Sequence, residues 1–106
     1  MSTHSVTSSH LSVASTILRR LGGQRFIILT GARNMLGGER FLQLRLPTPS
    51  PRPNVVRITL NDQDLYDVEF GRLKGFSYSV ISTRENVGVE ILRQVFEHAI
   101  GLRTSL

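Results

Sequence analysis

Two adjacent segments with alternating hydrophobicity constrain the fold more than any other feature of the sequence. Val55–Leu60 and residues 65–70 each carry an apolar side chain at every second position, and the polar residues 61–64 between them are typical of a turn. Aligning the apolar sets predicts an antiparallel hairpin. Its facing residues are Leu60 with Tyr66, Ile58 with Val68, Val56 with Phe70, Thr59 with Asp67, and Arg57 with Glu69. Because the last pair is oppositely charged and lies on the outer face, we expect an ion pair there.

Three further segments are predicted to be strands of the same antiparallel meander, which gives a five-stranded sheet. Residues 25–30 form a short apolar run, whereas residues 40–46 and 76–83 alternate. The residues expected to face inward in the last segment are Phe76, Tyr78 and Val80. Residues 31–38 have glycines at both ends and predict a glycine-hinged connection; they lack the Lys and Ser/Thr of a phosphate-binding loop.

The N-terminal part combines a polar tail with an amphipathic helix. Residues 1–10 are rich in Ser and Thr and are predicted to be a flexible tail. Residues 11–21 repeat apolar side chains at helical spacing, and Gly22 and Gly23 are typical of a helix end. An organelle transit peptide is the other interpretation of this acid-free start, but a helix that runs directly into a strand favours a structural element. Residues 11–106 are then expected to form a single domain.

A second amphipathic helix is predicted over residues 87–100. Its apolar stripe is wide enough to lie across a sheet, and Gly101 ends it. Ser82 and Glu85 have the spacing of a capping box, with Asn86 as a competing N-cap. The side chains expected to be buried are Ile91, Val95 and Phe96. The predicted fold class is therefore α+β: an N-terminal helix, a five-stranded antiparallel meander and a C-terminal helix, with both helices packed on one face of the sheet.

All four prolines stand at alternate positions within residues 47–53. Because proline lacks the backbone N–H, this segment cannot pair as a central strand, and it is predicted to be an extended, exposed loop between two strands. A second interpretation is a protruding finger, with Arg52 at its tip, that inserts into a partner.

The charge is divided unevenly along the chain. The formal net charge is +5, yet residues 1–58 hold eight arginines and only one acid, Glu39, whereas the remainder holds seven acids and five basic residues. Arginine binds phosphate and carboxylate groups through two parallel hydrogen bonds, so an anionic partner is one interpretation. The simpler interpretation is that these arginines are solvated surface groups, some of them paired with the acidic half of the same fold.

Nucleic acid or a nucleoprotein is the partner that we expect for the basic half. The aromatic residues predicted to face inward are Tyr66, Phe70, Phe76 and Tyr78, which leaves Phe41 outward. Base stacking is therefore not expected, and arginines would contact the phosphate backbone. The expected contact residues are Arg19, Arg20, Arg25, Arg33, Arg45 and Arg52. The other hypotheses are an accessory protein that inhibits or scaffolds a host or phage protein through the proline loop and the exposed sheet, an acidic protein as the partner, a small virion structural protein, and a homo-oligomer.

No residue pattern in the sequence points to catalysis, a cofactor or a metal. The chain has no cysteine, and no partnered base accompanies its serines. His98 lacks metal-ligand spacing, and the acidic cluster Asp62, Asp64 and Asp67 lacks the glycine and glutamate of a calcium loop. The apolar runs are too short to cross a membrane. We therefore expect a non-enzymatic protein with no catalytic residue, metal, cofactor or membrane partner.

Several segments also carry a family resemblance. They include Leu-Gly-Gly-Gln-Arg-Phe at residues 21–26, Thr-Gly-Ala-Arg-Asn at residues 30–34 and Asp-Leu-Tyr-Asp-Val-Glu-Phe-Gly-Arg at residues 64–72; the others are residues 17–18, 56–60, 101–102 and 104–106. As a set they are similar to small uncharacterised proteins encoded by bacteriophages and integrated bacterial elements. The Ser/Thr tail and the proline loop depart from that pattern. The resemblance implies a mobile-element origin, in a bacterial cytoplasm or a virion, and implies no activity or functional residue.

Overall fold

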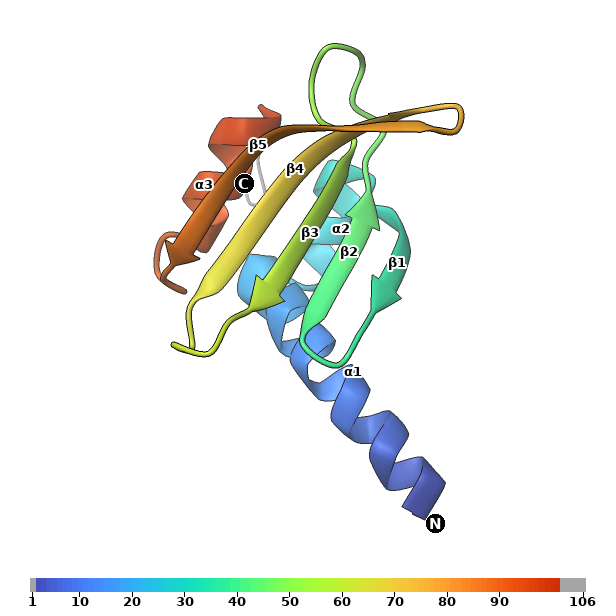
Figure 1. Cartoon of the computed structure of the whole chain (residues 1–106), viewed down its shortest axis with the longest axis vertical. Coiled ribbons are helices and arrows are strands. Elements are labelled where there is room, and N and C mark those ends of the chain that lie inside the picture. Colours follow the sequence, from blue (N-terminus) through green and yellow to red (C-terminus); the bar gives the residue numbers. More distant parts are fainter. Residues whose placement is uncertain (1, 102–106) are drawn as a thin grey trace.

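A five-stranded antiparallel sheet with three helices on one face makes up the protein (Figure 1). The computed structural model describes the backbone of residues 2–101 and the side chains of residues 12–101. The elements are α1 (Ser2–Leu21), α2 (Gln24–Thr30), β1 (Arg33–Gly37), β2 (Phe41–Arg45), β3 (Val55–Leu60), β4 (Tyr66–Lys74), β5 (Ser77–Val87) and α3 (Leu92–Ile100). The strands lie in sequence order, β1 to β5, so the sheet is a meander. The predicted α+β class, the meander and the packing of the terminal helices on one face are confirmed.

The register of the β3–β4 hairpin follows directly from its hydrophobic alternation and is confirmed at every position. Val56 pairs with Phe70, Ile58 with Val68, Leu60 with Tyr66, Thr59 with Asp67, and Arg57 with Glu69. The alternating apolar residues of β2, β3 and β4 are buried beneath the sheet, where they meet α1 and α3. The rings of Phe26 and Phe96 pack edge to face with centroids 5.1 Å apart, which joins α2 to α3 inside this core.

The strand predicted over residues 25–30 is wrong, because this segment forms α2. Only Phe26 and Thr30, four residues apart, are buried, and this is the spacing of one helix face. The Thr30 hydroxyl donates to the Phe26 carbonyl at 2.7 Å, and Gly31 ends the helix in the left-handed conformation, with φ 72°. A short apolar run fits a strand and a buried helix equally well, which is why the sequence pattern misled.

The first strand of the sheet lies instead in the segment predicted to be a glycine-hinged connection. β1 is almost wholly exposed, so it lacks the alternating pattern by which a strand is recognised. Its last residue, Gly37, lies against α1: a Cβ atom there would be 2.9 Å from the Cβ of Ala14. The number of strands is therefore as predicted, while the identity of the first strand is not.

Both terminal helices differ from their predicted bounds. α1 begins at Ser2, well before the predicted residue 11; the flexibility expected of residues 1–10 stays a prediction. α3 begins at Leu92, because β5 continues through Asn86 to Val87. The predicted capping box and N-cap therefore lie in a strand. Val95 and Phe96 are buried as expected, but Ile91 precedes the helix and is 39% exposed, so that expectation is wrong.

The proline-rich segment between β2 and β3 projects from one end of the sheet (Figure 1). Its base is fixed by hydrogen bonds: the Thr48 hydroxyl donates to the Pro53 carbonyl, and Arg72 Nη1 donates to the carbonyls of Thr48 and Arg52 at 2.8 and 2.9 Å. The side chain of Arg52 remains exposed. The extended loop is thus anchored to the sheet by an arginine of β4.

Candidate partner-binding face of the sheet

The face of the sheet opposite the helices, called the open face below, brings together side chains from all five strands. Strand alternation and register assign the members of this face. They are Arg33 and Leu36 of β1; Phe41, Gln43 and Arg45 of β2; Val55, Arg57 and Thr59 of β3; Asp67, Glu69 and Leu73 of β4; and Tyr78, Val80, Thr83 and Glu85 of β5. No described helix covers this face (Figure 1).

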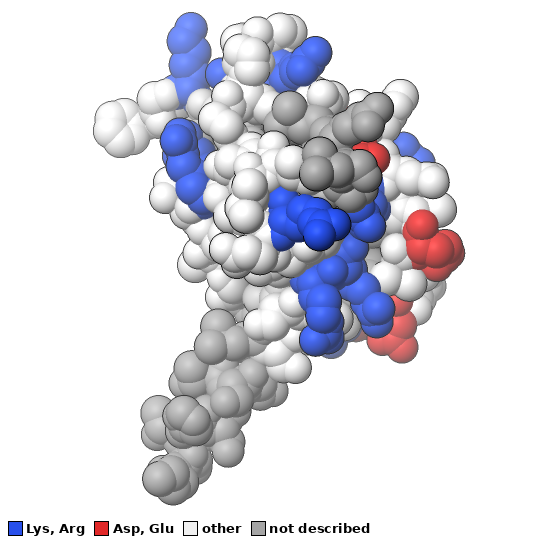
Figure 2. Space-filling view, turned by 180° about the vertical axis from the view of Figure 1, so that it is seen from behind, with Lys and Arg blue, Asp and Glu red and all other residues white. Residues whose placement is uncertain are grey.

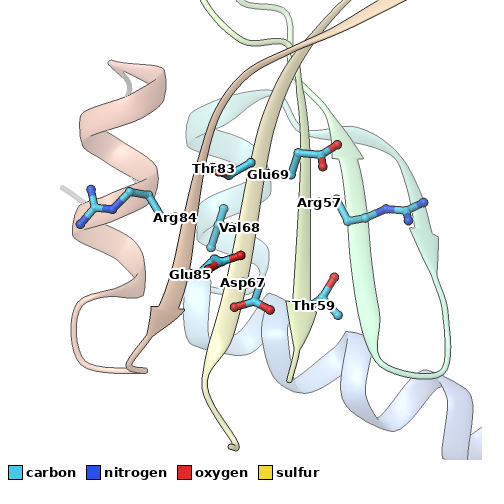
Figure 3. Close-up of a pocket in the computed structure, with 8 residues that line it drawn as sticks. All are labelled: Arg57, Thr59, Asp67, Val68, Glu69, Thr83, Arg84 and Glu85. Carbon is cyan, nitrogen blue, oxygen red and sulfur yellow. The ribbon is translucent and has the colours of Figure 1, made fainter. Parts of the chain in front are cut away.

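Charge divides the open face into two halves. Arg33, Arg45 and Arg57 stand on β1–β3, called the basic half, whereas Asp67, Glu69 and Glu85 stand on β4 and β5, called the acidic half. A depression of about 420 Å³ on the basic side is lined by Gln43, Arg45, Val55, Arg57, Glu69, Leu73 and Tyr78. A second one, of about 180 Å³, lies over the acidic side between β3 and β5 (Figure 3). The two depressions meet at Arg57 and Glu69, which line both.

Arg33 and Arg45 are neighbours across β1 and β2, and neither has an anionic partner within residues 12–101. Their Cα atoms are directly paired in the sheet register. Arg45 is half-buried, and its Nε atom is buried without any hydrogen-bond partner. Two like charges on directly opposite residues are unfavourable for the sheet. This pair of guanidinium groups is therefore an uncompensated positive site.

Arg57 is held toward β2 and not toward Glu69. Its guanidinium carbon lies 4.3 Å from the centroid of the Phe41 ring, and its Nε donates to Gln43 Oε1 at 3.1 Å. Figure 3 shows this side chain extending toward β2. The predicted register of Arg57 and Glu69 is correct, but the predicted ion pair is wrong, because each residue has another partner. Arg57 consequently adds its charge to the basic half.

Glu69 is bound instead by Tyr78 of β5. The Tyr78 hydroxyl donates to Glu69 Oε2 at 2.8 Å. To reach it, the phenol ring lies across Gly71, where a Cβ atom would be 2.1 Å from the hydroxyl oxygen. Burial of the hydroxyl, its hydrogen bond to Glu69 and the charge of Glu69 together raise the pKa of Tyr78 to about 12. Tyr78 is thus a neutral donor at physiological pH.

Three residues of the β4–β5 hairpin that were predicted to face inward are exposed: Phe76, Tyr78 (44%) and Val80 (53%). The pairing of β4 with β5 shifts between Phe70 and Gly71, which reverses the alternation beyond that point. This end of the hairpin also extends past the helices, and no described element covers it (Figure 1). Tyr66 and Phe70 are buried as expected, so the argument against base stacking holds for these two rings and not for Phe76 and Tyr78.

The six arginines predicted to bind nucleic acid do not form one surface. Arg33 and Arg45 lie on the open face. Arg19 and Arg20 end α1 and Arg25 lies in α2, all exposed on the helix-covered side, where Figure 2 shows basic side chains gathering. Arg52 lies in the proline loop. Sequence reasoning missed Arg57, although its position on the outer face was predicted, because Glu69 was expected to neutralise it.

The remaining polar clusters have structural explanations. Arg40 donates to the carbonyls of Leu60 and Asn61, both at 2.9 Å, and so fixes the turn after β3. Beside the same turn, Asp67 Oδ1 at the start of β4 accepts hydrogen bonds from the Asn61 side chain and the Asn86 backbone. In the described part of the chain, no group of His, Asp and Glu side chains could hold a metal ion, and no helix is long and apolar enough to span a membrane.

Comparisons with protein-family models, with curated proteins and with solved structures found no match.

Proposed function

We propose that this chain is a non-enzymatic binding protein, of bacteriophage or mobile-element origin, whose basic half holds single-stranded nucleic acid. The observation that carries the proposal is the uncompensated guanidinium pair Arg33 and Arg45 on an open sheet face. A phosphate group would supply the anionic acceptors that this pair lacks, and arginine is the side chain best suited to bind it bidentately.

Other groups on the open face suit a single strand better than a duplex. Arg57 is exposed on the basic half and lies over the half-buried ring of Phe41. Aromatic rings and arginine planes provide stacking surfaces for unpaired bases, whereas paired bases are not accessible to a flat sheet. This aromatic contribution revises the expectation from sequence that arginines alone would make the contacts.

The acidic half would limit the path of the bound nucleic-acid strand. Asp67, Glu69 and Glu85 would repel phosphates, so the strand would follow β1–β3 and not cross the whole sheet. Because the contacts go to the backbone and to ring faces, the sequence preference would be weak and the salt dependence steep.

Fluorescence anisotropy of a labelled single-stranded oligothymidine, measured over a series of salt concentrations, tests the proposal. Arg33→Gln and Arg45→Gln should each weaken binding and flatten the log–log salt slope by about 0.7, the value for one lost phosphate contact on a single strand. Arg20→Gln, at the end of α1, is the matched control and should leave the slope unchanged. Absence of binding at low salt, or a slope that responds only to Arg20→Gln, overturns the assignment of the open face.

A second candidate function is supported by the proline loop. The loop projects from the sheet and its base is anchored by Arg72 and Thr48, as in a preformed finger; the exposed Arg52 lies near this base, with its guanidinium beside Gly101 at the end of α3. On this alternative the chain is an accessory protein that contacts an acidic protein partner. On this alternative, Arg52→Ala should abolish binding of the chain to that partner, and oligothymidine should not bind to the chain.

A further inference from the structure

The outer edge of β5 is the longest unpaired strand edge in the described structure. β5 has 11 residues, and each one from Ser77 to Asn86 is exposed. It pairs with β4 on one side, and no strand within residues 2–101 pairs with the other. Its backbone N–H and C=O groups on that side are therefore available to another strand.

The part of β5 near the hairpin tip pairs with β4 alone and is not packed against a described helix. There, residues 77–79 pair with residues 72–74 of β4, which pair with no residue of β3, and this two-stranded ribbon, called the arm below, extends past the helices (Figure 1). An isolated two-stranded ribbon is marginally stable in water. The β4 side of the arm is closed by Asn54, whose side chain hydrogen-bonds to both the N–H and the carbonyl of Leu73. The β5 side is left without such a cover.

The side chains of residues 77–81 of β5 suit pairing with a second strand of the same sequence. Tyr78, Val80 and Ile81 are large apolar residues exposed by 44%, 53% and 46%. Residues 75–83 contain neither a charge nor a proline, the two devices by which proteins protect an edge strand. An uncharged segment can lie against its own copy without like charges meeting, and it offers nothing to a phosphate.

We propose that residues 77–81 of β5 pair antiparallel with the same residues of a second copy of the chain. A two-fold axis through Ser79 places Tyr78 of each copy opposite Val80 of the other. Directly opposed residues of two paired strands point to the same face of the sheet. Tyr78 and Val80 meet this condition because both belong to the open face. Arg84 and Glu85 lie beyond the paired segment, so neither charge meets its own copy. The two arms then form a four-stranded ribbon that continues both sheets.

Sedimentation equilibrium of the full chain, without nucleic acid and over a series of protein concentrations, tests this pairing. The chain should form a dimer, and Val80→Lys should weaken it at least about tenfold because two cations and their desolvation enter the interface. Leu36→Lys is the matched control, since Leu36 is also 53% exposed but lies on the opposite edge strand, β1. It should leave the dimer unchanged.

Circular dichroism should show the same helix and strand content for both variants, because neither side chain belongs to the core. A chain that stays monomeric at all concentrations overturns the proposal and leaves the edge to a peptide from another protein. A dimer that Val80→Lys does not weaken, or that Leu36→Lys weakens equally, also overturns it. Oligothymidine binding is measured separately, so failure here does not affect the proposed function.

Discussion

The two edge strands of the sheet differ in nearly every property that controls pairing. β1 has five residues, an irregular register with β2, an arginine at its start, and a non-glycine residue, Asn34, at positive φ. β5 has 11 residues; its residues 77–83 carry no charge and include three large exposed side chains, Tyr78, Val80 and Ile81. β1 is thus protected against further strand pairing, whereas the arm of β5 is not. On the two proposals made above, the edges of one sheet would serve different purposes: β1 would carry charge for an anionic ligand, and β5 would offer backbone for another strand.

The largest expected effect separates the shared core from the exposed arm. Phe96 is buried against Phe26, so Phe96→Ala should lower the free energy of unfolding by about 3–5 kcal/mol. Phe76, at the tip of the β4–β5 hairpin, is fully exposed, so Phe76→Ala should change it by less than about 0.5 kcal/mol. Urea denaturation of both variants measures the difference. Equal losses would mean that the arm is packed into the core.

The next effect concerns how β1 is held. Gly37 lies so close to Ala14 that an added Cβ atom would force α1 away from the sheet. Gly37→Ala should therefore destabilise the protein by about 1–3 kcal/mol, as overpacking does. Ala14→Gly in the same background should restore part of the loss, because it removes the opposing Cβ atom. Thermal denaturation of the single and double variants would detect the rescue, and additive losses would contradict the contact.

The contact between Tyr78 and Glu69 should raise the measured pKa of Tyr78. Its folded pKa of about 12 lies above the ordinary tyrosine pKa of 10.0, so the unfolded chain loses this proton first as pH rises. The stability from Tyr78 is complete below pH 10 and is lost as pH rises toward 12. Ultraviolet absorbance of the tyrosinate, with Tyr78→Phe as the reference, measures the pKa. Glu69→Gln should lower it, because the neighbouring negative charge is removed; an unchanged value would remove Glu69 as a cause.

The smallest effect tests the boundary between the two halves of the open face. Arg57 and Glu69 are directly opposite, yet Arg57 contacts Phe41 and Gln43 while Glu69 accepts from Tyr78. A double-mutant cycle with Arg57→Ala and Glu69→Ala should give a coupling energy below about 0.5 kcal/mol, the range of weak surface pairs. A coupling well above 1 kcal/mol would show that the two charges pair after all.

The sequence predicted the centre of the sheet well and its margins poorly, for physical reasons. The β3–β4 register could be read from alternation because both strands bury one face. β1 fully buries none of its side chains, so no alternation marks it, and the apolar run of α2 is too short to distinguish a helix from a strand. The register shift between β4 and β5 after Phe70 places Tyr78 and Val80 on the opposite face from the predicted one, and no pattern in the sequence predicts this shift.

The candidate site was only partly predictable for the same reason. Arg33 and Arg45 were in the expected set, but their direct pairing depends on β1, which alternation could not reveal. Arg57 was placed correctly and then set aside, because a facing carboxylate suggested neutralisation. The side chain instead lies over Phe41, a contact set by rotamers and not by register.

Mapping of backbone amide shifts by nuclear magnetic resonance, with oligothymidine added at low salt, tests the central claim most directly. The account predicts that the shifts concentrate at Arg33, Gln43, Arg45 and Arg57 on β1–β3, and that α1, α2 and the acidic half change little. Shifts confined to Arg19, Arg20 and Arg25 on the helix-covered side, or no shifts at all, would contradict it.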